Sequence, residues 1–186
     1  MKRVIFIEPN INNKIINKIF NKYNSDSKFV NPHICLVFPF ESNLTTNEID
    51  TILKNTLSGV ECFDIFIKGI SISYENNNNF IFLNIADTND ILATISEKLY
   101  YELGNNAILK TDKYIPHITI AKNKSKDKIN LIYNEISRFN TLLINLKVDK
   151  IYSKIMIKDS MNNIRLQNEL EYILNKKKKE RWFNEV

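Results

Sequence analysis

In the first half of the chain, short apolar segments alternate with longer segments whose apolar residues recur at helical spacing. The short segments, at residues 4–8, 32–38 and 63–74, predict strands. The first longer segment predicts a helix capped by Asn10, and its apolar face consists of Ile11, Ile15, Ile16, Ile19 and Phe20. The second opens with a capping box, Thr45–Glu48. This half therefore predicts the order strand, helix, strand, helix, strand.

A run of four asparagines, residues 76–79, separates this half from the next. Asparagine tolerates positive φ, so the run predicts a hairpin between the strand at 63–74 and a strand at 80–86. A helix capped by Asp87 or Asn89 should follow, and its apolar face consists of Ile91, Leu92, Ile95, Leu99 and Leu103.

The remainder of the chain predicts two more strands, at 115–121 and 143–152, on either side of a helix. A short strand at 154–158 comes next. A last helix is expected from the spacing of Leu166, Leu170, Ile173 and Leu174. Up to residue 152, the second half thus repeats the order of the first.

The repeated order predicts an α+β fold with two pseudo-symmetric lobes around a central cleft. Lobe one is expected at about 1–75 and lobe two at about 80–158, with a C-terminal helix and basic tail at about 160–186. Each lobe should hold a small, mainly antiparallel sheet with helices outside. Because no linker composition marks the boundary, residues 1–186 should form a single bilobal domain.

Composition and charge exclude several classes of function. The chain is 44% hydrophobic and 25% charged, as in ordinary globular proteins. It contains neither G-x-G-x-x-G nor G-x-x-x-x-G-K, so dinucleotide-fingerprint and Walker-type sites are excluded. No apolar run is long enough for a membrane span or a signal peptide, so a cytoplasmic protein without membrane association is expected. The net charge of +5 favours anionic partners such as nucleotides or RNA.

Cysteine and histidine are scarce, which argues against metal and disulfide frameworks. Cys35 and Cys62 are expected to be reduced and buried, and with only two histidines a zinc site is improbable. No cofactor is therefore expected.

Both histidines lie in the same tripeptide, Pro-His-Ile. One stands in the segment Asn31–Leu36 and the other in Ile115–Ile120. Each falls on the third predicted element of its half, so the local repeat and the repeat of elements align the halves at the same point. Side chains alternate along a strand, so His33 should share a face with Cys35, and His117 with Thr119.

Two imidazoles across a cleft can supply acid–base chemistry to a phosphodiester without a metal. One, as the free base, takes a proton from water or a ribose hydroxyl, and the other, as imidazolium, protonates the leaving oxygen. The hydroxyl of Thr119 can donate a hydrogen bond to a non-bridging phosphate oxygen. A 2′,3′-cyclic phosphate is a natural substrate, because ring strain favours release of one ribose oxygen.

These residues resemble the signature of the two-histidine (2H) phosphoesterase superfamily, especially its bacterial 2′-5′ RNA ligase-like and cyclic phosphodiesterase branch. That family carries two H-x-[T/S]-Φ motifs, Φ being apolar, in duplicated lobes around a cleft. His117–Ile120 matches at every position, and His33–Leu36 at all but the third. The resemblance covers residues 1 to about 158. It implies a phosphoesterase of cyclic phosphates or related phosphodiesters in RNA or nucleotides, with 2′-5′ RNA ligation as the reverse reaction.

The resemblance also implies roles for the motif residues. His33 would be the proton donor and His117 the acceptor, while Cys35 and Thr119 would hold phosphate oxygens. Cys35 departs from the family pattern: a thiol is a weaker donor, which should weaken phosphate stabilisation by about 1 kcal/mol. Covalent attack by Cys35 is disfavoured, because residues i and i+2 of a strand are parallel neighbours.

Other residues and interpretations stay open. Lys113, Tyr114 and Lys122 flank the second motif and are candidate contacts to phosphate or base, and Phe38 and Phe40 could stack a base; surface and core positions are the alternatives. The protein could instead be a non-catalytic RNA- or nucleotide-binding module on the same fold, which the substitution at Cys35 favours. A third interpretation is an interaction protein that uses the basic run Lys176–Lys179. A monomer is expected.

Overall fold

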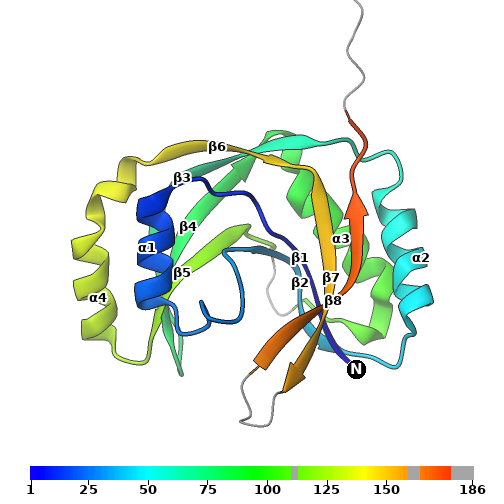
Figure 1. Cartoon of the computed structure of the whole chain (residues 1–186), viewed down its shortest axis with the longest axis horizontal. Helices are drawn as coiled ribbons and strands as arrows, with labels where there is room; N and C mark the ends of the chain where they lie inside the picture. Colours follow the sequence, from blue (N-terminus) through cyan, green and yellow to red (C-terminus); the bar gives the residue numbers. More distant parts are fainter. Residues whose placement is uncertain (110–112, 159–163, 177–186) are drawn as a thin grey trace, which may run out of the picture.

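Two four-stranded antiparallel sheets with helices outside make up the fold of the computed structural model (Figure 1), which describes residues 1–109, 113–158 and 164–176. This is the predicted α+β class. The elements in chain order are β1 (Lys2–Ile7), α1 (Lys14–Tyr23), β2 (Ile34–Glu41), α2 (Thr46–Leu57), β3 (Phe63–Tyr74), β4 (Asn79–Asp87), α3 (Ile91–Leu103), β5 (His117–Asn123), α4 (Lys126–Glu135), β6 (Leu143–Val148), β7 (Lys150–Lys158) and β8 (Ile164–Ile173).

The assignment of strands to sheets differs from the predicted lobes. The first sheet has the order β2-β1-β7-β8 and the second the order β5-β4-β3-β6. The strand β3, expected in lobe one, lies in the second sheet, because the asparagine hairpin pairs it with β4. The predicted strand at 143–152 is divided at Asp149 into β6 of the second sheet and β7 of the first. The first sheet therefore draws its strands from both ends of the chain.

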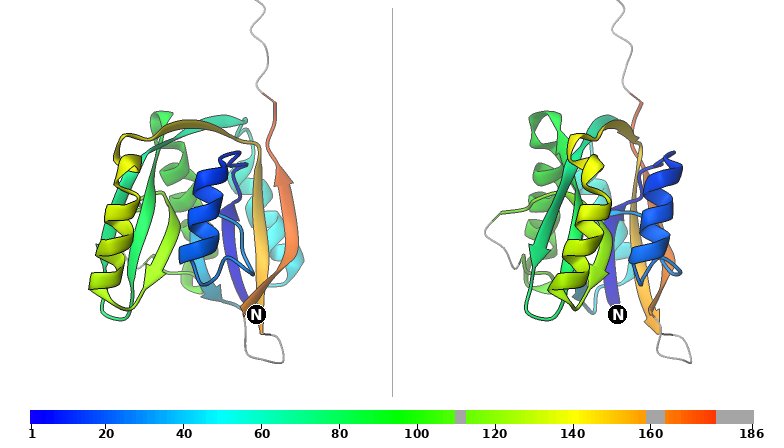
Figure 2. Two further views of the ribbon diagram at one scale, coloured as in Figure 1. Left: turned by 60° about the vertical axis from the view of Figure 1, so that its left-hand side comes forward. Right: turned by 90° about the vertical axis from the view of Figure 1, so that its left-hand side faces the viewer.

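Two of the helices pack on the sheet that does not contain the strand preceding them. Helix α1 follows β1 of the first sheet but packs on β5 of the second, and α3 follows β4 of the second but packs on β2 of the first. Helix α4 joins α1 on the second sheet, while α2 packs on α3 and β8 (Figures 1 and 2). Each motif strand is thus backed by a helix from the other half of the repeat. Among the described residues, no helix is long and apolar enough to cross a membrane.

Helix N-termini follow the sequence with one correction. The side chain of Thr45 accepts a hydrogen bond from the backbone N–H of Glu48, and the Glu48 carboxylate accepts one from the backbone N–H of Thr45. The capping box is therefore confirmed. The first helix is capped by Asn13 instead of Asn10: the Asn13 side chain accepts from the N–H groups of the two residues after Lys14. Asp87 accepts from the N–H of Leu92 at 2.8 Å at the start of α3.

The predicted C-terminal helix is wrong, because residues 164–173 form β8, antiparallel to β7. Ser153 pairs with Leu170 but the next residue, Lys154, pairs with Asn168, so Glu169 is the extra residue of a β-bulge. The bulge breaks the two-residue alternation and leaves apolar residues four positions apart, which imitates a helical face. Lys176 of the basic run is described and exposed; the rest of that run lies outside the described residues.

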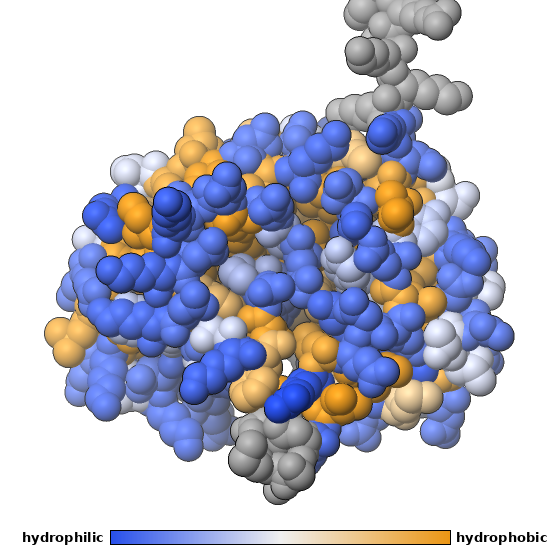
Figure 3. Space-filling model, viewed as in Figure 1, coloured by the Kyte–Doolittle hydropathy of each residue, from blue (hydrophilic) through white to orange (hydrophobic). Residues whose placement is uncertain are grey.

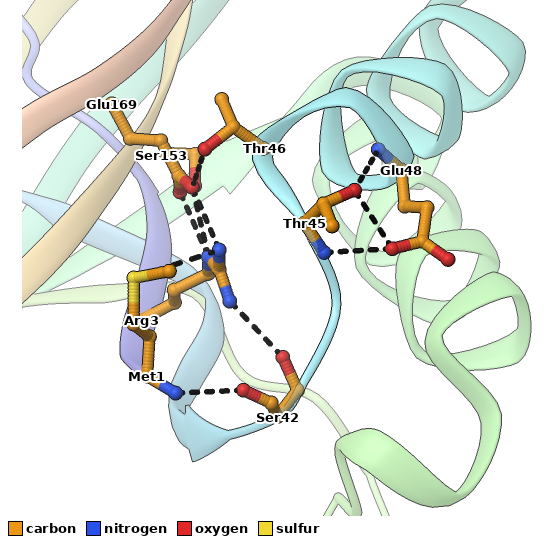
Figure 4. Close-up of polar contacts among 8 residues, drawn as sticks. All are labelled: Met1, Arg3, Ser42, Thr45, Thr46, Glu48, Ser153 and Glu169. Atoms are coloured by element: carbon orange, nitrogen blue, oxygen red, sulfur yellow. Dashed lines mark hydrogen bonds and ion pairs between the residues drawn. The ribbon is translucent and has the colours of Figure 1, made fainter.

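The side chain of Glu169 forms a buried ion pair with Arg3 of β1 (Figure 4). The closest contact is 2.9 Å, and the side chains are 0% and 2% exposed. Ser153 and Thr46 each donate a hydrogen bond to the carboxylate at 2.9 Å. This cluster joins β1, β7, β8 and the start of α2.

Candidate active site

The two histidine motifs lie on strands β2 and β5, which end the strand order of their sheets and contact each other. His33 immediately precedes β2, and His117 is the first residue of β5. Their positions in the two ladders correspond. Cys35 pairs with Phe6 of β1, and Thr119 pairs with Phe82 of β4.

Each imidazole is held in the same way. Nδ1 of His33 lies 2.8 Å from the carbonyl oxygen of Asn31, and Nδ1 of His117 lies 2.8 Å from that of Ile115. A carbonyl oxygen can only accept, so Nδ1 carries the proton in both rings. Nε2 is therefore the nitrogen that can exchange a proton with a substrate.

An aromatic ring packs on each histidine. The ring centroids of Phe6 and His33 are 5.1 Å apart, and those of Phe82 and His117 are 4.1 Å apart. Each phenylalanine stands opposite the third motif residue on the neighbouring strand. Together with the bond at Nδ1, this contact fixes the plane of the imidazole before a ligand arrives.

A β-bulge follows the third motif residue in both strands. In the first sheet, Leu36 is the extra residue between the pairs that involve Cys35 and Val37, and in the second, Ile120 is the extra residue. Both bulge residues are fully buried. A bulge re-aims neighbouring side chains, so the apolar fourth position of the motif has a structural reason. In the sequence, each bulge is marked by two consecutive apolar residues that follow a strict alternation of motif residues between the two faces of the strand.

Reciprocal hydrogen bonds connect the two motifs. The hydroxyl of Tyr114, which precedes the second motif, donates to the carbonyl oxygen of Cys35 at 2.8 Å. The side-chain amide of Asn24, which precedes the first motif, donates to the carbonyl oxygen of Thr119 at 3.1 Å. Each motif strand is thus tied to the segment that leads into the other. Asn24 was not among the residues that the sequence singled out, because nothing local distinguishes it.

The environment lowers the pKa of both histidines. Burial is the main cause for His33 and outweighs the bond to Asn31 and the charge of Glu8, which raise its pKa. Burial is also the main cause for His117, and the charge of His33 adds to it.

A largely buried ion pair that sequence reasoning missed stands beside His33. The ammonium of Lys154 lies 2.7 Å from the carboxylate of Glu8, and 4.9 Å from the ring centroid of Phe6. In the second sheet, Asn84 pairs with His117 and occupies the position that corresponds to Glu8, two residues after the phenylalanine. The two halves thus share their backbone framework but differ in charge.

Cys35 is an uncharged thiol at neutral pH. Burial raises the pKa of its thiol to about 12. A thiol in this state is a poor nucleophile and a weak donor, which supports the expectation that Cys35 does not attack substrate. Both cysteines are free; Cys62 is buried as expected, whereas Cys35 is only partly buried.

A groove of about 610 Å³ runs along the open face of the second sheet. His117, Thr119 and Phe82 line it together with Phe38 of the first motif strand, which is 38% exposed. His33 and Cys35 are not among its lining residues; Cys35 lies on the strand that brings Phe38 to the groove, and His33 immediately precedes that strand.

The remaining predicted contacts are divided between groove, core and surface. Lys113 is exposed and lines the groove. Tyr114 also lines it, although the residue is only 4% exposed. Lys122 lies outside the lining and faces Asp26 at 3.6 Å, and Phe40 belongs to the core. Within the described ranges, no group of three or more His, Cys, Asp or Glu side chains is placed to hold a metal ion.

Two sheets that each carry a histidine motif at an edge strand are the arrangement of the two-histidine superfamily. The model of the 2′-5′ RNA ligase superfamily matches residues 7–152, and the chain belongs to this superfamily. No match was found among curated proteins.

Solved structures share the fold at low sequence identity. TT0787 of Thermus thermophilus is similar with a TM-score of 0.65 and 11% identity, over 96% of this chain and 100% of that one. E. coli LigT complexed with NADP⁺ is similar with a TM-score of 0.60 and 10% identity, over 94% and 98% of the two chains. E. coli LigT complexed with 3′-AMP has a TM-score of 0.56 at the same identity and coverage.

Proposed function

We propose that this protein is a phosphoesterase that opens 2′,3′-cyclic phosphates of RNA or nucleotides, with His33 and His117 as its acid–base pair. The observation that carries the proposal is the duplicated setting of the two imidazoles, each with Nδ1 bound to a carbonyl oxygen and its ring against a phenylalanine. Histidines with a purely structural role would not need the same arrangement twice. Two histidines that act on one phosphate need both imidazoles to be held in this way.

The proposed step is hydrolysis by in-line displacement at phosphorus. Nε2 of His117 takes a proton from water as the water oxygen bonds to phosphorus, and the bond from phosphorus to one ribose oxygen breaks. The imidazolium of His33 gives its Nε2 proton to that oxygen. The Thr119 hydroxyl and, more weakly, the Cys35 thiol donate to the non-bridging oxygens. With a ribose hydroxyl in place of water as the nucleophile, the same displacement joins RNA ends, and its reversal cleaves that linkage.

The relatives support a nucleotide as the ligand. E. coli LigT was crystallised with NADP⁺ and with 3′-AMP. Two free thiols support a reducing, cytoplasmic setting.

The test is turnover of 2′,3′-cyclic AMP in the presence of a chelator, with the product identified by ³¹P NMR. We expect a single nucleoside monophosphate, formed at a rate that the chelator does not change. Binding of the nucleotide without any turnover would instead favour the binding-module interpretation that the neutral Cys35 thiol supports. Neither binding nor turnover of any cyclic phosphate would refute the proposed function.

Replacing Cys35 by threonine should keep the rate or raise it by up to about fivefold, because a hydroxyl is the better donor to a phosphate oxygen by about 1 kcal/mol. Steady-state kinetics of Cys35→Thr and Cys35→Ala on the same cyclic nucleotide provide the measurement. A collapse of turnover in Cys35→Thr would mean that the thiol itself has a role that a hydroxyl cannot replace.

A further inference from the structure

The two histidines are held alike but have different neighbours on the adjacent strand. In the second sheet, Asn84 pairs directly with His117 across β4 and β5. In the first sheet, the ladder between β1 and β2 ends at the residues that immediately precede Glu8 and follow His33. One step further along the two strands, Glu8 is therefore the cross-strand neighbour of His33, and side chains in this relation interact directly.

Each of these neighbours is fixed by a partner of its own. The amide oxygen of Asn84 accepts a hydrogen bond from the hydroxyl of Ser71 at 2.7 Å, so this pair is uncharged. The carboxylate of Glu8 instead accepts a hydrogen bond from the ammonium of Lys154 at 2.7 Å. The side chains of Lys154 and Glu8 are only 11% and 19% exposed, so solvent screens their charges less than those of a surface pair. One histidine thus has a neutral pair beside it and the other an ion pair.

The ring of Phe6 contacts both His33 and Lys154. Its centroid lies 5.1 Å from that of the His33 ring and 4.9 Å from the ammonium of Lys154. The ring centroid of Tyr152 lies 5.2 Å from the same ammonium. Contacts with two aromatic faces position the ammonium, and the ammonium in turn fixes where the Glu8 carboxylate lies.

A hollow of about 420 Å³ with many polar side chains in its wall opens beside this ion pair. Glu8 lines it together with Asn31 and Pro32, the two residues that lead into His33. The carbonyl oxygen of Asn31 is the one that binds Nδ1 of His33. Another part of the wall belongs to α1, over which the surface is predominantly hydrophilic (Figure 3). Polar surroundings of this kind allow Glu8 to keep its charge next to the imidazole.

Titratable groups surround the two imidazoles from several elements. Around His33 they are Glu8 of β1, Cys35 of β2, Tyr152 and Lys154 of β7, and Asp26, which faces Lys122 of β5 at 3.6 Å. The charges that act on His117 are those of His33 and Glu75.

The effect of these charges differs between the two rings. Glu8 raises the pKa of His33 more than Lys154 lowers it. A proton on His33 lowers the pKa of His117 more than Glu75 raises it. The charges therefore favour an imidazolium at His33 and a neutral ring at His117, which is the distribution of protons that the proposed step requires.

We propose that Glu8, held in place by Lys154, is a positioning residue that keeps the transferable proton on His33. Glu8 acts through His33, and Lys154 acts through Glu8. This inference rests on the proposed function. It gives a physical reason why His33 is the proton donor and His117 the acceptor, two roles that the duplicated backbone by itself leaves equivalent.

Proton NMR of the imidazoles tests this inference without requiring turnover. The chain contains only two histidines, so two Cε1–H signals titrate, and His33→Gln and His117→Gln assign them. The pKa of His33 should fall in Glu8→Gln and rise in Lys154→Met, because the first variant removes an anion and the second a cation. A contact with a merely structural role would change the pKa in the same direction in both variants. That result, or an unchanged pKa in Glu8→Gln, would overturn the inference.

Two further variants are matched to these, and the melting temperature verifies the fold of each. Glu171→Gln removes a carboxylate from another lysine–carboxylate pair of the first sheet, on the distant strand β8, and should leave the pKa of His33 unchanged. Asn84→Asp places a carboxylate beside the other histidine and should raise the pKa of His117. An effect of Glu171→Gln on His33 as large as that of Glu8→Gln would contradict a local action of Glu8.

Kinetics then test the role of this proton in catalysis. At about pH 8, on the alkaline limb, Glu8→Gln should lower kcat/KM for 2′,3′-cyclic AMP by about three- to tenfold, because the rate there follows the protonated fraction of the donor. Asn84→Asp should instead move the acidic limb to higher pH. An unchanged alkaline limb in Glu8→Gln, with a wild-type protein that turns over, would overturn the inference and leave the proposed function intact. Absence of turnover in the wild type, with the expected NMR titrations, would refute the proposed function while the effect of Glu8 on His33 stands.

Discussion

Replacing either His33 or His117 by glutamine should lower kcat on 2′,3′-cyclic AMP by about 10²–10⁴-fold, which is the contribution of general acid–base catalysis by one residue. Glutamine keeps a polar group near the position of Nε2 but cannot exchange a proton. Because the two imidazoles act in one step, the double variant should be little worse than either single variant. Stopped-time assays with separated products give kcat.

The fold should persist in both variants. Each imidazole is partly exposed at the start of an edge strand, and its loss removes one bond to a backbone carbonyl. Melting temperature and circular dichroism provide the control, and Lys98→Gln on α3 is a matched variant away from the site. Turnover near the wild-type level in either histidine variant would reject paired proton transfer.

Arg3→Met should lower the free energy of unfolding by about 3–5 kcal/mol, because it leaves the carboxylate of Glu169 buried without its cation. The double variant Arg3→Met/Glu169→Leu should recover most of this loss, since no charge then stays buried. Urea denaturation of the two variants gives the comparison. A loss below about 1 kcal/mol in Arg3→Met would show that the pair is solvated and does not hold β8 in place.

The same pair predicts a dependence of stability on pH. Burial alone would raise the pKa of Glu169, but hydrogen bonds from Arg3, Ser153 and Thr46 outweigh it and lower the pKa from 4.5. A lowered pKa in the folded state means that the carboxylate stabilises the fold above about pH 4.5, and that this contribution disappears as the pH falls through the lowered value. The double variant should therefore lose less stability in acid than the wild type.

Features set by local chemistry could be predicted from the sequence. The strand β3 has its predicted bounds, Phe63–Tyr74, and the capping box begins α2 where expected. The asparagine run joins β3 and β4 as a hairpin. The repeated Pro-His-Ile tripeptide placed both histidines at corresponding positions of two edge strands, because a motif and its strand are encoded within a few residues.

Features set by contacts between distant segments could not be predicted. The first sheet pairs β1 with β7, residues about 150 positions apart, and no local pattern reports such a pairing. The bulge at Glu169 made a strand resemble a helix, and the partner of this bulge residue, Arg3, lies at the other end of the chain. The ion pair between Glu8 and Lys154 could not be predicted either, because its two residues are also far apart in the sequence.

The dependence of kcat/KM on pH, measured in chelator between about pH 4 and 9, tests paired proton transfer most directly. A cyclic phosphate diester keeps one negative charge over this range, so both limbs of the profile belong to the protein. We predict a bell whose maximum lies below pH 6.5, because burial lowers the pKa of both imidazoles from that value. A profile that rises to a plateau without falling, or a bell with its maximum well above pH 6.5, would contradict a mechanism in which one histidine must be neutral and the other protonated.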